Sequence, residues 1–163
     1  MSPTPLSLAL ALLAAAGCSA PHGNLDPVFG TDSSIAIVAT PGDVAGYRLD
    51  PEHDGAQPVE ATPGGYPILE GPLEVEGAVA TELRALLTDP ATFPAPEAAK
   101  GCLPRYGVRL EFVQPEGRVD VVVCLECSVL LVYRDDVHAG TGHFDDASED
   151  LEVLLSRARL LDD

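Results

Sequence analysis

The sequence predicts an α+β domain in which an antiparallel sheet is packed by two amphipathic helices. Two segments, 72–87 and 146–160, place apolar side chains at helical spacing. Between them, residues 106–133 alternate as strands do around a tight turn, which indicates a three-stranded meander. Without its first 18 residues the 163-residue chain is still long enough for one domain with a real core.

The N-terminal segment has the pattern of an export signal. Leu6 to Ala16 is almost wholly apolar, and small residues lead to Cys18. The run is shorter than the about 20 residues needed to span a bilayer, but it fits the apolar region of a signal peptide. Residues 1–5 carry no Lys or Arg, which most secretory signals have. The segment resembles a bacterial lipoprotein signal, and this resemblance implies that Cys18 is lipidated after residues 1–17 are removed.

The lipoprotein resemblance also implies a location. Ser19, which follows the lipidated cysteine, is compatible with sorting to the outer membrane. We therefore expect a protein of the cell envelope, anchored by lipid and facing the periplasm. Residues 19–33 are rich in Pro, Gly, Asn, Asp and Ser, and they predict a flexible tether before a single domain at 34–163.

The charge of the chain excludes some partners. Nine Lys and Arg stand against 26 Asp and Glu, a formal net charge of −17. Nucleic acid is excluded as a partner because phosphate binding needs a basic surface. Anionic headgroups would also repel this surface, so we expect membrane attachment through the N-terminal lipid alone. No phosphate loop or serine-hydrolase elbow is present, which favours a binding or structural role with an unidentified envelope protein over enzymatic activity.

The first half of the domain predicts short strands. Residues 34–39 and 44–49 are apolar enough for two strands, and Pro41-Gly42-Asp43 between them is typical of a turn, so the pair predicts a hairpin. Residues 50–65 predict a surface loop. Residues 66–69 contain a proline and predict a short edge strand, where proline is tolerated.

The two predicted helices differ in how their ends are marked. Residues 72–87 gather their apolar side chains on one face and end before Pro90. Residues 146–160 begin with Asp146 and Glu149 at the spacing of a capping box. The apolar positions of the second helix are Ala147, Leu151, Leu154, Leu155 and Ala158.

The turn at Gln114-Pro115-Glu116-Gly117 fixes a strand register. Proline at the second position and glycine at the fourth are typical of a type I turn. If the turn joins two antiparallel strands, Phe112 faces Val119 and the following apolar pairs all fall on one face of the hairpin. Glu111 faces Asp120 on the other face, and this pair of like charges predicts that this end of the face is wet.

The same register brings three cysteines to one end of the meander. Cys102 arrives beside Cys124 and Cys127, which form the corner before a third strand at 128–133. An oxidising envelope favours a structural disulfide. Three pairings are possible, and the register favours Cys102 with either Cys127 or Cys124. No cofactor is expected in this interpretation, and one cysteine stays unpaired.

Two alternatives give the same cysteines a chemical role. Cys102, Cys124 and Cys127 would form a zinc site with a fourth ligand. His138 and His143 follow the third strand, at the end opposite the cysteines, and Glu126 and His53 are weaker candidates. The second alternative is a functional thiol, although a redox Cys-x-x-Cys motif usually opens a helix and this one lies between strands.

One further resemblance covers residues 73–161. The segments Lys100–Val108 and Val121–Cys127, followed by His143–Asp146 and a final helix, resemble a group of small bacterial proteins of unknown function. Many of these proteins are lipoproteins with a Cys-x-Pro, a β-hairpin ending in Cys-x-x-Cys and a C-terminal helix. This chain has Leu103 where the group has an aromatic residue. The resemblance implies a single α+β fold and a role for the cysteine corner.

Overall fold

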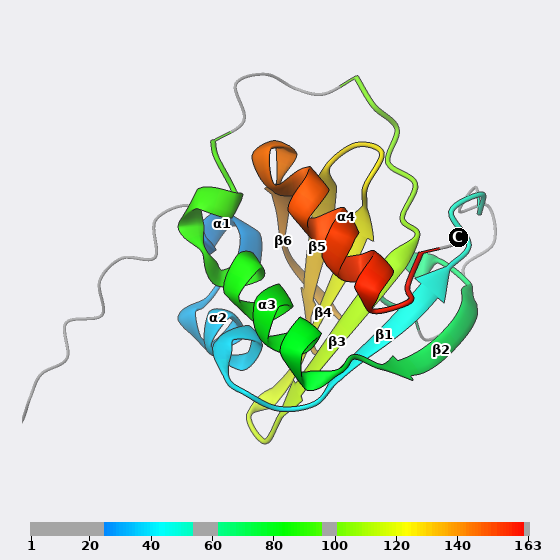
Figure 1. Cartoon of the computed structure of the whole chain (residues 1–163). Coiled ribbons are helices and arrows are strands. Elements are labelled where there is room, and N and C mark those ends of the chain that lie inside the picture. The colour runs from blue at the N-terminus through cyan, green and yellow to red at the C-terminus, as the bar shows by residue number, and fades with distance from the viewer. Residues whose placement is uncertain (1–24, 54–61, 96–100, 162–163) are drawn as a thin grey trace, which may run out of the picture.

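The structure is a six-stranded antiparallel sheet with four helices on one face (Figure 1). It is a computed structural model that describes residues 25–53, 62–95 and 101–161. The strand order is β2-β1-β3-β4-β5-β6. The strands are β1 (Val44–Leu49), β2 (Ile68–Glu74), β3 (Val108–Gln114), β4 (Gly117–Cys124), β5 (Val129–Arg134) and β6 (Val137–His143). The helices are α1 (Asp26–Phe29), α2 (Asp32–Ala39), α3 (Gly77–Thr88) and α4 (Ser148–Arg157), with short 3-10 helices η2 (Pro63–Gly65), η3 (Pro90–Thr92) and η4 (Asp145–Ala147).

The predicted class, α+β with an antiparallel sheet, is therefore confirmed, and so is the register of the β3–β4 hairpin. Phe112 pairs with Val119 and Glu111 pairs with Asp120, as the turn between the strands predicts. The sheet is larger than a three-stranded meander, because β6 returns beside β5 and β1 adds to the free edge of β3. Four helices cover one face, where the sequence predicts two.

The strand predicted at 34–39 is wrong, because these residues form α2. The Thr31 side chain accepts a hydrogen bond from the Ser34 amide and so caps the helix. Ile35, Ile37 and Val38 are all buried in the core. A short apolar run of this kind fits a buried strand or a buried helix equally well by periodicity. The predicted 34–49 hairpin is therefore also wrong, and β1 pairs with β2 and β3 instead.

Residues 25–33 of the predicted tether belong to α1, α2 and the turn between them, whereas residues 19–24 lie outside the described residues. Leu25, Val28 and Phe29 are buried in the main core, and α1 packs against β5 and β6. Three apolar residues among many polar ones gave too weak a pattern to predict this helix. Cys18 and the predicted signal segment lie outside the described residues.

The helix predicted at 72–87 begins later than expected. Leu73 and Glu74 pair with β1 and belong to the edge strand β2, which extends the strand predicted at 66–69. The helix itself starts at Gly77 and buries Val79, Leu83 and Leu87. Residues 72–75 fit the helical pattern of apolar residues, but they adopt extended backbone because β1 supplies hydrogen-bond partners for their backbone groups.

The apolar face predicted for the C-terminal helix is confirmed, but the predicted N-terminal cap is wrong. All five predicted apolar positions are buried. The helix starts at Ser148 after the 3-10 turn η4, and no side chain caps either element, so the capping box predicted at Asp146 is wrong. No helix in the described ranges is long and apolar enough to cross a membrane.

A buried arginine joins the helical layer to the sheet. The Arg84 Nη1 donates to the Val38 carbonyl at 2.6 Å, and Nη2 donates to the Gly42 carbonyl at 2.9 Å. Its guanidinium lies 5.0 Å from the centre of the Phe112 ring. The side chain thus satisfies the Val38 carbonyl in the last turn of α2, where carbonyls lack a partner within the helix, and a carbonyl of the loop that follows.

The contact between α1 and β6 depends on a glycine. A Cβ added at Gly140 would lie 2.2 Å from the Pro27 carbonyl oxygen and 2.5 Å from that of Val28. Because both are backbone atoms, we expect Gly140→Ala to lower the free energy of unfolding by about 1–3 kcal/mol in urea denaturation. Gly77→Ala is the control, since nothing lies within 4 Å of a Cβ there. Equal stability of the two variants would contradict the predicted close packing.

Candidate functional site

The face of the sheet opposite the helices carries the polar and cysteine-containing features of the molecule. Its side chains alternate along the strands with those of the main core. Toward the end of the sheet where β4 finishes, a second, smaller cluster of buried residues forms on this face, containing Leu49, Tyr106, Val122, Cys124, Cys127 and Val129. We call this surface the open face. It places the cysteine corner next to a network of charges.

The structure joins Cys102 and Cys127 in a disulfide with a Cα–Cα distance of 5.8 Å. This is one of the two pairings that the hairpin register favours. The bond connects the irregular segment before β3 to the turn between β4 and β5. Cys102 is exposed, whereas Cys127 is buried.

The third described cysteine, Cys124, is a free thiol at the end of β4. Its side chain is fully buried. The Arg105 backbone amide donates a hydrogen bond to the Cys124 sulfur at 3.2 Å, and this contact holds the segment that follows Cys102 against the corner. All three sequence-predicted cysteines are therefore at one end of the sheet.

His138 and His143, both predicted at the far end of the meander, lie near opposite ends of β6. His138 pairs with Tyr133 at that far end, but His143 pairs with Val129 beside the corner, because β6 runs back along β5. The prediction that His143 lies at the end of the meander away from the cysteines is therefore wrong. In the described ranges no group of three or more His, Cys, Asp or Glu side chains is arranged to hold a metal ion.

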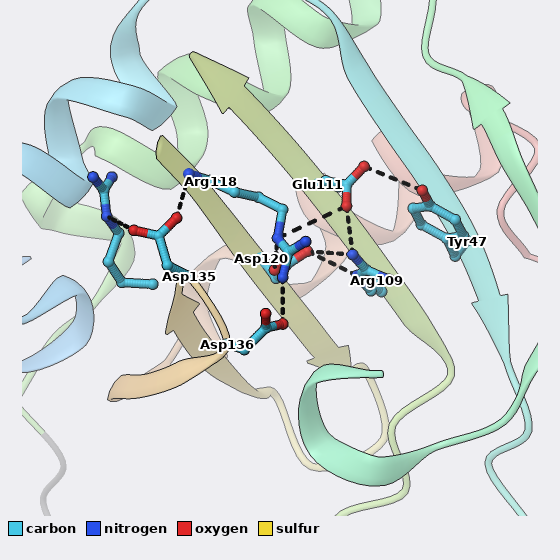
Figure 2. Close-up of polar contacts among 8 residues, drawn as sticks. Tyr47, Arg109, Glu111, Arg118, Asp120, Asp135 and Asp136 are labelled. Atoms are coloured by element: carbon cyan, nitrogen blue, oxygen red, sulfur yellow. Dashed lines mark hydrogen bonds and ion pairs between the residues drawn. The ribbon is translucent and has the colours of Figure 1, made fainter. Parts of the chain in front are cut away.

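A buried ion-pair network lies at the centre of the open face (Figure 2). Asp120 on β4 has 0% exposure. The Arg109 Nε, on β3, donates to the Asp120 Oδ1 at 2.8 Å. The Arg109 Nη2 lies 2.7 Å from the same oxygen. The same Nη2 donates to Glu111 at 2.5 Å, and Glu111 accepts from the Tyr47 hydroxyl at 3.1 Å. Arg109 also lies over the Tyr47 ring, 4.5 Å from its centre.

A second arginine extends the network to the surface. The Arg118 Nε donates to the other oxygen of Asp120 at 2.9 Å, and its Nη2 bonds to Asp136. Asp135 accepts from the Arg118 backbone amide and pairs with Arg134 at 2.9 Å. Burial raises the pKa of Asp120, although both arginines oppose this rise. The result is a fully buried carboxylate held between two guanidinium groups.

Sequence reasoning found the Glu111–Asp120 pairing but not its surroundings. It predicts a wet face from two like charges, whereas Asp120 is buried and Glu111 is mostly covered. The prediction leaves out Arg109 and Arg118, which pair with Asp120. In the predicted register both fall on the same face as the acids, and this alternation of charge was the signal available in the sequence.

The tyrosines also gather on this side of the sheet. All four tyrosines of the chain have a raised pKa, and burial is the largest cause in each case. Tyr66 and Tyr106 meet edge to face with ring centres 5.3 Å apart. Burial and the charge of a Cys124 thiolate raise the pKa of Tyr106 to about 12.

These raised values predict alkaline instability. Between about pH 10 and 12 a tyrosine in the unfolded chain loses its proton while Tyr106 keeps it, so the free energy of unfolding falls as the pH rises through this range. Denaturation followed by circular dichroism from pH 9 to 12 measures the decline. Tyr106→Phe should make the decline shallower, and an unchanged slope in this variant would contradict the prediction.

No protein-family model matches the chain, and comparisons with curated proteins and with solved structures found no match. The arrangement itself combines a cross-linked corner, one buried thiol and a nearly charge-balanced network of ion pairs. All of these features lie on the face of the sheet that the helices leave uncovered.

Proposed function

We propose that the chain is a lipid-anchored protein of the cell envelope with a binding or structural role, in which the Cys102–Cys127 disulfide stabilises the domain. Cys18 would carry the lipid, and the domain would face the periplasm from the outer membrane. An envelope protein is the expected partner, membrane contact is through the lipid, and no cofactor is needed.

The disulfide is the observation that carries this proposal. Cys102 and Cys127 are paired across 25 residues, and disulfides persist in oxidising compartments such as the periplasm. The pairing agrees with the export signal predicted from residues 6–18, which lies outside the described residues. The irregular segment before β3 has few backbone partners in the sheet, so a covalent link there has a direct structural use.

Intact mass spectrometry tests the cross-link. The full chain with Cys18→Ser should have a mass two hydrogens below the reduced value under denaturing, non-reducing conditions. It should accept one alkyl group after denaturation and three after reduction. Three alkyl groups without reduction would exclude the disulfide.

Membrane fractionation tests the anchor separately. The unaltered chain, expressed in a bacterium that processes lipoproteins, should incorporate labelled fatty acid and sediment with outer membranes. The Cys18→Ser variant should lose the label and leave the membrane fraction. Sedimentation of this variant with membranes, without label, would contradict anchoring by lipid alone.

The alternative function uses Cys102, Cys124 and Cys127 as a thiol or zinc site. The buried thiol of Cys124 next to the paired cysteines favours keeping this candidate. Native mass spectrometry distinguishes the two functions. Bound zinc that leaves on denaturation, with three free thiols, would make the corner a metal site.

A further inference from the structure

The cysteine corner holds a thiol in a place where it can exchange with the neighbouring disulfide. Cys124 is the last residue of β4, Cys127 lies three positions later in the turn before β5, and both belong to the same buried cluster. The β-turn itself runs from Leu125 to Ser128, whose amide donates to the Leu125 carbonyl at 3.0 Å, so the chain reverses directly after Cys124. This reversal brings Cys127 back toward the end of β4, and a bond between Cys124 and Cys127 would need a Cα–Cα distance of about 4.4–6.8 Å.

The Cys124 sulfur also lies against the chain segment that carries Cys102. It accepts the Arg105 amide at 3.2 Å, three residues after Cys102. A nucleophile held in the same corner as its target has a high effective concentration, which favours a reaction within the corner over attack by an outside thiol. The corner thus contains a free sulfur, that of Cys124, and a disulfide in which Cys127 would be attacked and Cys102 would leave.

The exposure of the three cysteines indicates which sulfur would reach the surface after an exchange. Cys124 is fully buried and Cys127 is nearly so, whereas Cys102 is exposed. The residue next to Cys102, Leu103, is 85% exposed. Release of Cys102 would therefore place a thiol at the surface beside an exposed apolar side chain.

We propose that Cys102 is a latent surface thiol, released when Cys124 exchanges into the disulfide. The Cys124 thiolate attacks the Cys127 sulfur, the bond between Cys127 and Cys102 breaks, and Cys102 leaves as a thiolate that takes up a proton. One disulfide and one thiol are present before and after, so no oxidant or reductant is needed. The freed Cys102 is then a modification site for a small disulfide: the Cys102 thiolate attacks one of its sulfurs, the bond between its two sulfurs breaks, and the other sulfur leaves as a thiol.

This inference rests on the disulfide of the proposed function, and one experiment separates the two. The oxidised full chain with Cys18→Ser is incubated in its native state with iodoacetamide at pH 8, quenched in acid, digested without reduction and mapped by mass spectrometry. We expect a single alkyl group on Cys102 and a peptide linked by Cys124–Cys127. The rate should rise with pH, because the thiolate is the nucleophile.

The control is Cys124→Ser, which should keep the Cys102–Cys127 disulfide and take up no label. Label on Cys124, or no label under native conditions with one on Cys124 after denaturation, would overturn the exchange while leaving the cross-link intact. Label on all three cysteines would overturn both proposals, because no disulfide would be present.

Discussion

Replacement of both Cys102 and Cys127 by serine is expected to lower the free energy of unfolding by about 3–4 kcal/mol. The disulfide closes a loop with a sequence separation of 25, and the chain-entropy model assigns a loop of this size that contribution. The reason is that the cross-link removes conformations from the unfolded chain. Urea denaturation of the oxidised protein and of the double variant gives the difference directly.

Reduction of the unaltered protein should produce a similar loss, since both treatments remove the same bond. The matched control is Cys124→Ala, which removes a buried thiol but leaves the cross-link. Its cost should be smaller, and it should not depend on added reductant. A double variant as stable as the oxidised protein would contradict a structural role for the disulfide.

Asp120→Ala is expected to destabilise the protein by about 3–5 kcal/mol, the cost of breaking a buried ion pair by removing one partner. Asp120 is fully buried and accepts from Arg109 and Arg118. Without it, the buried guanidinium of Arg109 keeps Glu111 as its one acidic partner among the residues that the structure describes. Thermal and urea denaturation measure the loss.

Two variants show whether burial is the cause. Asp136→Ala removes the acid bonded to the Arg118 Nη2, but this side chain is 68% exposed, so its loss should cost less than about 1 kcal/mol. The double variant Arg109→Met with Asp120→Leu replaces both charges by apolar groups and should recover much of the stability lost in Asp120→Ala. Equal costs for Asp120→Ala and Asp136→Ala would contradict a special role of the buried network.

The parts of the fold that the sequence predicts well are those with two agreeing local signals. In the β3–β4 hairpin the turn residues and the alternation of apolar side chains specify the same register, and the structure has it. The same register brings Cys102 to the corner. The C-terminal helix has an unbroken apolar face, and this face is buried.

The parts that the sequence does not predict depend on contacts between distant segments. Residues 34–39 have one apolar signal and become a helix because Thr31 caps them and the core accepts Ile35 and Val38. The return of His143 to the cysteine end depends on β6, whose small and polar residues carry little strand signal. The burial of Asp120 required both arginines, which approach it from its own strand and from β3.

If the proposed lipid anchor holds, the short distance in sequence between Cys18 and the buried Leu25 would limit how far the domain can travel from a membrane. If Cys18 carries the proposed lipid, seven Cα steps separate the anchor from the first buried residue, and at 3.3–3.6 Å per residue they span at most about 25 Å. A compact domain of this size has a radius of gyration of about 14 Å. A partner must therefore come close to the lipid surface to meet the open face. The strong negative charge of the domain would keep it at the outer end of that range, away from anionic headgroups.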